Sequence, residues 1–94
     1  MNTYQLFFGR NIGVDGYVSD DNLTAFIDGV LAVAFDSFTL QHAQGCWQGI
    51  REDTLIVTVA TSVYDKIIDV SNCYKNAFSQ DAVGIMNIPS MQFV

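Results

Sequence analysis

The sequence predicts an α+β fold in which a four-stranded antiparallel sheet carries two helices on one face. Four short segments are rich in β-branched and aromatic residues, and two longer segments repeat apolar residues at helical spacing. These segments follow one another in the order β-α-β-β-α-β. Half of the 94 residues are apolar and 15% are charged, which is typical of one globular domain spanning residues 1–94.

The first strand is predicted over residues 3–10, "TYQLFFGR". It is short, rich in aromatic residues and ended by Gly9. Aromatic side chains fall on both of its faces, with Tyr4 on one and Phe7 on the other. Residues 11–17 contain two glycines and are predicted to form a loop.

The first helix is predicted over residues 19–35. Ser19 is a good N-cap, and Asp20 and Asp21 behind it oppose the positive end of the helix dipole. Gly29 weakens the helix by roughly 1 kcal/mol relative to alanine. The predicted buried stripe consists of Leu23, Phe26, Ile27, Val30, Leu31 and Ala34.

Two strands are predicted over residues 37–43 and 54–60. The intervening residues 44–53 contain two glycines and are predicted to form the turn between them. The two strands would therefore make an antiparallel hairpin with a long turn.

The second helix is predicted over residues 61–79, capped by Thr61 or Ser62, with Asp65 completing a capping box. Its predicted buried stripe consists of Val63, Ile67, Val70, Tyr74 and Ala77. The fourth strand, residues 81–88, ends before Pro89. Residues 90–94 form a tail or one more short strand.

The β-α-β-β-α-β order is that of the ferredoxin-like split βαβ arrangement. Right-handed crossovers place both helices on one face of the sheet and leave the other face open. Phe7 would then meet water in a monomer. Few charged residues are present to cover the surface, so we expect the chain to be a homo-oligomer.

The formal net charge of −6 disfavours partners with a phosphate backbone, and we expect no nucleic acid partner. No run of 18 apolar residues occurs, so we expect no membrane partner. The first residues lack the basic start and long apolar segment of a secretory signal, which predicts a cytoplasmic protein.

The two cysteines, Cys46 and Cys73, do not form a CxxC pair, and the chain has a single histidine. These residues do not make a usual zinc site, and we expect no metal and no cofactor. The cysteines are expected to be reduced, Cys73 against the core and Cys46 in a loop.

His42 and Arg10 are two candidate substrate-binding residues. His42 on an alternating strand is either a base or a half-buried residue that pairs across the sheet. Arg10, at the end of the first strand, either binds a carboxylate through its fork or is a solvated charge paired with an aspartate.

The segment "GCWQGIREDTL", residues 45–55, contains the only tryptophan, Trp47, and the only glutamate, Glu52. One interpretation is structural, with Trp47 covering the rim of the core and Glu52 flanking a strand. The other is a ligand site, in which Trp47 stacks on a purine or a cation and Glu52 accepts hydrogen bonds from a hydroxyl or an ammonium group. A nucleoside that carries a sulfonium group offers a stackable base, ribose hydroxyls and a permanent positive charge.

The sequence resembles two families. One is an uncharacterised bacterial domain family, through "LFFG" at 6–9, "GCW" at 45–47 and "YKNAFSQDAV" at 74–83. The other is the small phage S-adenosylmethionine lyases, formerly called hydrolases, whose hairpin carries Gly-Cys-Tyr followed by a glutamate before the third strand. Trp47 stands at the tyrosine position and Glu52 at the glutamate position, so the role of a tyrosine hydroxyl is not carried over.

The second resemblance implies a ferredoxin-like trimer with ligand sites between subunits in the cytoplasm of a phage host. It implies cleavage of S-adenosylmethionine to methylthioadenosine and homoserine lactone, by attack of the substrate's own carboxylate. Glu52 would then be catalytic, and the substrate would be bound by Trp47, Gln48, Arg10 and His42. The alternative is a non-catalytic oligomeric module that binds a small ligand or a host protein.

Overall fold

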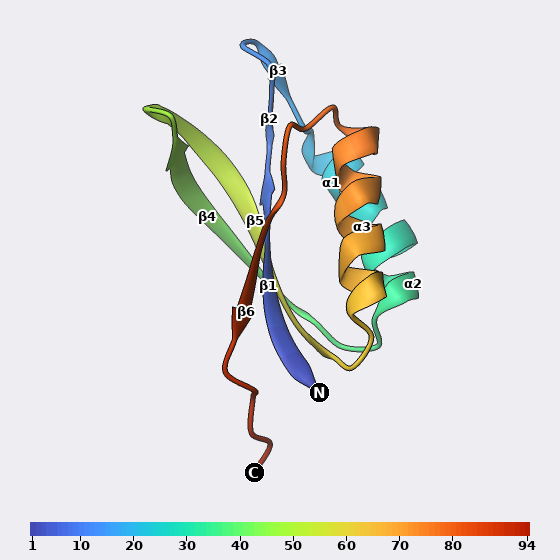
Figure 1. The fold of residues 1–94 in the computed structure, drawn as a ribbon. Coiled ribbons are helices and arrows are strands. Elements are labelled where there is room, and N and C mark those ends of the chain that lie inside the picture. The colour runs from blue at the N-terminus through green and yellow to red at the C-terminus, as the bar shows by residue number, and fades with distance from the viewer.

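The computed structural model describes residues 1–94 and contains one four-stranded antiparallel sheet in the order β4-β5-β1-β6. The helices all lie on one face of this sheet, and the other face is open (Figure 1). The predicted α+β, ferredoxin-like fold class is confirmed. The sheet consists of β1 (Asn2–Gly9), β4 (Thr39–Trp47), β5 (Ile50–Thr61) and β6 (Gly84–Ile88). The helical layer consists of α1 (Asp20–Phe26), the π-helical η1 (Ile27–Leu31), α2 (Ala32–Ala34) and α3 (Tyr64–Ala77).

The core lies between the sheet and the helices. Alternate residues of β1 and β5 point to opposite faces, and those on the helix side are buried. They are Tyr4, Leu6, Phe8, Leu55, Val57 and Val59. At the end of the core nearest the β4–β5 turn, Phe8 packs on Tyr74 with ring centroids 4.5 Å apart, and Phe26 packs on Tyr74 at 5.1 Å. Burial of these aromatic rings joins the end of β1 to both long helical segments.

The first helical segment begins as predicted. The hydroxyl of Ser19 accepts a hydrogen bond of 3.1 Å from the backbone N–H of Asn22. The middle of the segment, η1, is π-helical and contains Gly29. The sequence pattern predicted an uninterrupted α-helix here, which is wrong over these five residues.

The predicted turn over residues 44–53 is wrong. β4 and β5 pair without interruption from Thr39 opposite Thr58 to Trp47 opposite Ile50. The turn is only Gln48 and Gly49, whose φ angles are 50° and 80°. Positive φ at both positions matches the handedness of a two-residue hairpin turn. The sequence pattern predicts Gly45 in a loop, but cross-strand pairing with Glu52 holds it in an extended strand.

The predicted capping of α3 is also wrong. The N-cap residue is Val63, whose side chain makes no capping hydrogen bond, and Asp65 completes no capping box. The hydroxyl of Thr61 instead accepts a hydrogen bond from the backbone N–H of Val63, just before the helix. Because α3 begins at Tyr64, Val63 lies outside the buried stripe and is exposed.

Three smaller expectations need correction. Ala77 is exposed, and so are both cysteines: Cys73 lies on the solvent side of α3 and Cys46 lies within β4. Helical periodicity defined the stripe, but it did not reveal that α3 meets the core only through its middle turns.

The first predicted loop and the C-terminal segment also differ from prediction. The predicted loop over residues 11–17 contains a small hairpin of β2 (Asn11–Ile12) and β3 (Gly16–Tyr17). The last strand begins at Gly84 rather than 81, and residues 90–94 form no strand.

No helix has the length and apolar character needed to cross a membrane.

Candidate ligand-binding groove

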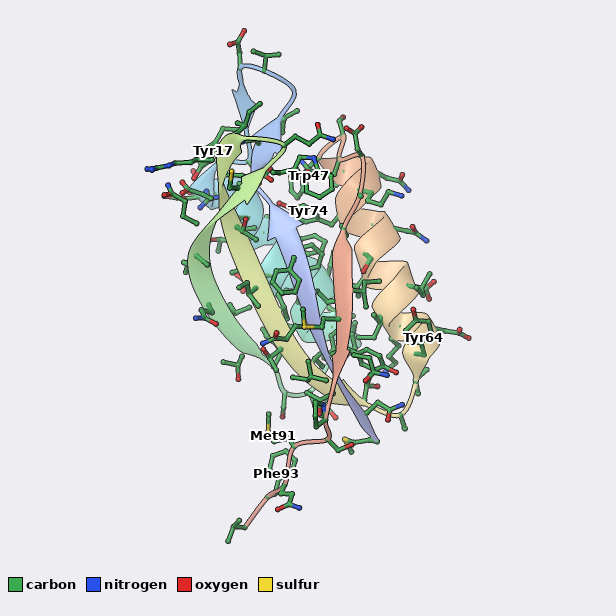
Figure 2. The ribbon with its side chains drawn as sticks, turned by 60° about the vertical axis from the view of Figure 1, so that its left-hand side comes forward. Tyr17, Trp47, Tyr64, Tyr74, Met91 and Phe93 are labelled. Atoms are coloured by element: carbon green, nitrogen blue, oxygen red, sulfur yellow. The ribbon has the colours of Figure 1, made fainter.

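A groove of about 670 Å³ lies at the hairpin end of the open sheet face. Its floor includes Phe7 and Gly9 of β1, one wall is the β4–β5 hairpin, and the other is the segment between α3 and β6. Trp47 and Tyr74 lie at this end of the molecule, and the C-terminal residues Met91 and Phe93 lie at the opposite end (Figure 2).

Glu52 lines this groove, and neighbouring groups hold its carboxylate in place. Its Oε2 atom accepts a hydrogen bond of 3.0 Å from the backbone N–H of Asn11. Its carboxylate lies directly over Gly9, where the Cβ atom of any other residue would stand only 2.5 Å from Oε2. A glycine is therefore required at position 9 for this placement, because any side chain there would displace the carboxylate. Glycine is used here for close approach, not for an unusual φ angle.

A second layer of contacts holds the groups around Glu52. The side-chain amide of Gln80 donates a hydrogen bond of 2.7 Å to the carbonyl oxygen of Asn11. The Tyr74 hydroxyl donates to the carbonyl oxygen of Gly9 at 2.7 Å. Burial raises the pKa of Tyr74, the positive charge of Arg10 partly opposes this, and the negative charge of Glu52 raises it further. The phenol therefore stays protonated and keeps its donor role.

Trp47 presents a largely free aromatic face beside this carboxylate. Its side chain is 64% exposed, and its cross-strand neighbour Ile50 is 65% exposed. Trp47 lies two positions from Gly45, the residue opposite Glu52, so Trp47 and Glu52 share a sheet face. Gln48, in the turn, also lines the groove. The structure thus brings together three of the five residues expected to form a site.

Arg10 and His42 lie elsewhere. They line a separate hollow of about 350 Å³, together with Gln44 and Asp53. On β5, Asp53 alternates with Glu52, so its side chain points to the opposite face of the sheet. A site made of all five predicted residues therefore does not form on a single copy of the chain.

Arg10 is a buried structural residue, 6% exposed. Its Nε and Nη2 atoms donate to the carbonyl oxygen of Val18 at 3.1 and 2.7 Å, and Nη2 also pairs with Asp20 at 2.7 Å. Its guanidinium lies 4.5 Å from the ring centre of Tyr17. One interpretation of Arg10 was a solvated charge paired with an aspartate. Arg10 does pair with an aspartate, but its guanidinium is buried rather than solvated.

We expect Arg10→Met to lower the free energy of unfolding by about 1–3 kcal/mol, because the Val18 carbonyl loses its charged donor while the apolar length is kept. Urea unfolding monitored by circular dichroism measures this change. Arg51→Met is the matched control, because Arg51 is exposed on the hairpin. Equal stability of the two variants would contradict a structural role for Arg10.

Sequence reasoning missed three residues around the groove: Asn11, Gln80 and Asp81. Gln80 and Asp81 stand in the "YKNAFSQDAV" segment, but only the fold shows that this segment faces the hairpin. No group of three or more histidine, cysteine, aspartate or glutamate side chains is arranged to hold a metal ion.

Comparison with known proteins gives one family and one fold likeness. None of the curated proteins matches the chain. Two solved structures, a phage SAM lyase in the apo state and a phage SAM lyase in complex with S-methyl-5'-thioadenosine, share the fold. Each has a TM-score of 0.60 and 14% sequence identity, over 99% of this chain and 92% of the other. The family model described as "Protein of unknown function (DUF3574)" matches residues 3–93, so the chain belongs to that family.

Proposed function

We propose that the protein is an S-adenosylmethionine lyase that uses the groove as its substrate site. The observation that carries the proposal is that one groove contains both an exposed aromatic face, Trp47, and a hydrogen-bonded carboxylate, Glu52. The fold shared with the phage SAM lyases supports it.

The groove suits an adenosyl sulfonium compound in size and charge. Its volume of about 670 Å³ is in the range of small-molecule sites. Trp47 would stack on the purine, as aromatic side chains do on bases. Glu52 would accept hydrogen bonds from the ammonium group or the ribose hydroxyls, and Asp81 adds a second carboxylate at the opposite wall. The net charge of −6 favours a cationic ligand over an anionic one.

The proposed reaction needs no nucleophile from the protein. A carboxylate oxygen of the substrate attacks its own γ-carbon, the bond from this carbon to sulfur breaks, and the electron pair goes to sulfur. The products are the neutral thioether methylthioadenosine and homoserine lactone, and no proton is transferred. The protein has to hold the methionyl chain in a bent conformation and limit the access of water.

This chemistry decides where Glu52 is useful. The positive charge of the sulfonium group decreases on the way to the transition state, so a carboxylate against sulfur would stabilise the substrate more than the transition state. Glu52 would instead orient the substrate through its ammonium or ribose groups. The hydrogen bond from Asn11 and the close packing on Gly9 hold the carboxylate in place, which such orientation requires.

Incubation of the purified protein with S-adenosylmethionine, followed by chromatography, tests the proposal. We expect methylthioadenosine and homoserine lactone in equal amounts, at a rate above the spontaneous decay measured without protein. A rise in melting temperature with S-adenosylmethionine but no excess product would replace the lyase with a binding module. If S-adenosylmethionine produces neither excess product nor a thermal shift, both the lyase and the binding module are refuted.

A further inference from the structure

We propose that the groove binds adenosyl sulfonium amines that lack a carboxylate more tightly than S-adenosylmethionine itself, and that Asp81 is a specificity-determining residue for this ligand class. Decarboxylated S-adenosylmethionine, which keeps the adenosyl, sulfonium and ammonium groups, is the simplest member. This inference rests on the proposed function, because it takes the groove as the adenosyl site.

The groove carries negative charge and no positive charge. Glu52 on β5 and Asp81 in the segment between α3 and β6 both line it, and no lysine, arginine or histidine does. Asp81 is exposed and takes part in no ion pair, because the single ion pair of the protein joins Arg10 to Asp20. The charge of Asp81 is therefore free to act on a ligand.

The four basic residues of the chain lie away from the groove. Arg10 is buried, and its guanidinium is hydrogen-bonded within the protein. Arg51 precedes Glu52 on β5, so its side chain points to the other face of the sheet. Lys66 and Lys75 lie on α3, in the helical layer. A ligand carboxylate in the groove thus meets no cationic side chain of its own chain.

Several neutral donors at the groove are already used within the protein. The side-chain amide of Asn11 donates to a backbone carbonyl of β5 at 3.2 Å. The amide of Gln80 donates to the carbonyl oxygens of Asn11 and Phe78 at 2.7 and 3.2 Å. The hydroxyl of Thr54 also donates to a backbone carbonyl, at 3.2 Å. A ligand carboxylate would lose hydration here without gaining a charged partner, which disfavours its binding.

The unpaired carboxylate agrees with the proposed reaction. Negative charge on the attacking oxygen decreases as its bond to the γ-carbon forms, so a lysine or arginine against it would stabilise the substrate more than the transition state. A groove without such a base leaves the carboxylate nucleophilic but binds the substrate less tightly. A compound without the carboxylate carries one more net positive charge and also lacks the nucleophile, so it binds and forms no lactone.

Rapid-mixing fluorescence of the single tryptophan compares the two ligands before product accumulates. We expect decarboxylated S-adenosylmethionine to bind at low salt at least roughly fivefold tighter than S-adenosylmethionine. High salt should reduce this preference by screening. The rise in melting temperature with each ligand is a second measurement, independent of the fluorescence signal.

Asp81→Asn removes the charge and keeps the shape of the side chain. It should weaken the binding of decarboxylated S-adenosylmethionine more than that of S-adenosylmethionine, and leave the affinity for neutral methylthioadenosine unchanged. The matched control Asp69→Asn removes the same charge from an exposed position on α3 and should keep the full preference.

Equal or weaker binding of the decarboxylated compound, or a preference that Asp81→Asn leaves unchanged, would overturn the inference. Methylthioadenosine release from S-adenosylmethionine is measured separately. Release without the preference would refute this inference and keep the lyase, whereas the preference without release would refute the lyase and keep this inference. Binding of neither compound would refute both.

Discussion

Replacing Glu52 by glutamine should lower kcat/KM for S-adenosylmethionine by at least roughly tenfold, equivalent to about 1.4 kcal/mol of transition-state stabilisation. The substitution keeps the length of the side chain, and its carbonyl oxygen can still accept the hydrogen bond from the Asn11 N–H. It removes the negative charge that would bind the substrate ammonium or ribose. Steady-state release of methylthioadenosine measures the effect, and circular dichroism checks that the variant is folded.

Gly9→Ala tests the same carboxylate without changing it. The new Cβ would lie 2.5 Å from Oε2 and 2.6 Å from the carboxyl carbon of Glu52, so the carboxylate has to move. We expect a loss of activity similar to that of Glu52→Gln. Because both changes act on one group, their combination should lose little more than either alone.

The matched control for Gly9→Ala is Gly29→Ala, where a Cβ meets no atom within 4 Å. It should leave turnover unchanged. An unaffected rate in folded Glu52→Gln would remove Glu52 from the reaction. Additive losses in the double variant would show that Gly9 acts by another route than the position of the carboxylate.

Replacing Trp47 by alanine should weaken the binding of methylthioadenosine by about 5–150-fold, the equivalent of the roughly 1–3 kcal/mol that a base–aromatic stack contributes. The side chain is 64% exposed, so its loss should change the melting temperature little. In the wild type, methylthioadenosine should quench or shift the fluorescence of this single tryptophan. Calorimetric titration gives the affinity of each variant.

Trp47→Phe and Ile50→Ala separate stacking from simple apolar cover. Phenylalanine keeps a flat ring and should recover most of the affinity. Ile50, opposite Trp47 and equally exposed, has no aromatic face, so its truncation should cost much less. If Trp47→Ala unfolds the protein and ligand leaves wild-type fluorescence unchanged, Trp47 is a structural residue at the rim of the core.

The sequence alone predicted the fold class because local pattern and topology agree in this chain. Period-two alternation in β1 and β5 and helical spacing in both helical segments mark which side chains face the core, and the Ser19 cap marks one helix start. The interpretation of residues 44–53 as a turn failed because two glycines are a local signal for a loop. Pairing with β5 along the whole hairpin outweighs that preference.

Composition singled out Trp47 and Glu52, because each is the only residue of its type in the chain. Their placement side by side depended on the hairpin register, and the fixed position of the carboxylate depended on Gly9 and Asn11 from β1 and the chain after it. The division between groove and hollow depended on the alternation of Glu52 and Asp53 on β5. Side-chain periodicity is local and is written in the sequence, whereas which faces and loops meet across the sheet is set by long-range pairing, which only the tertiary structure decides.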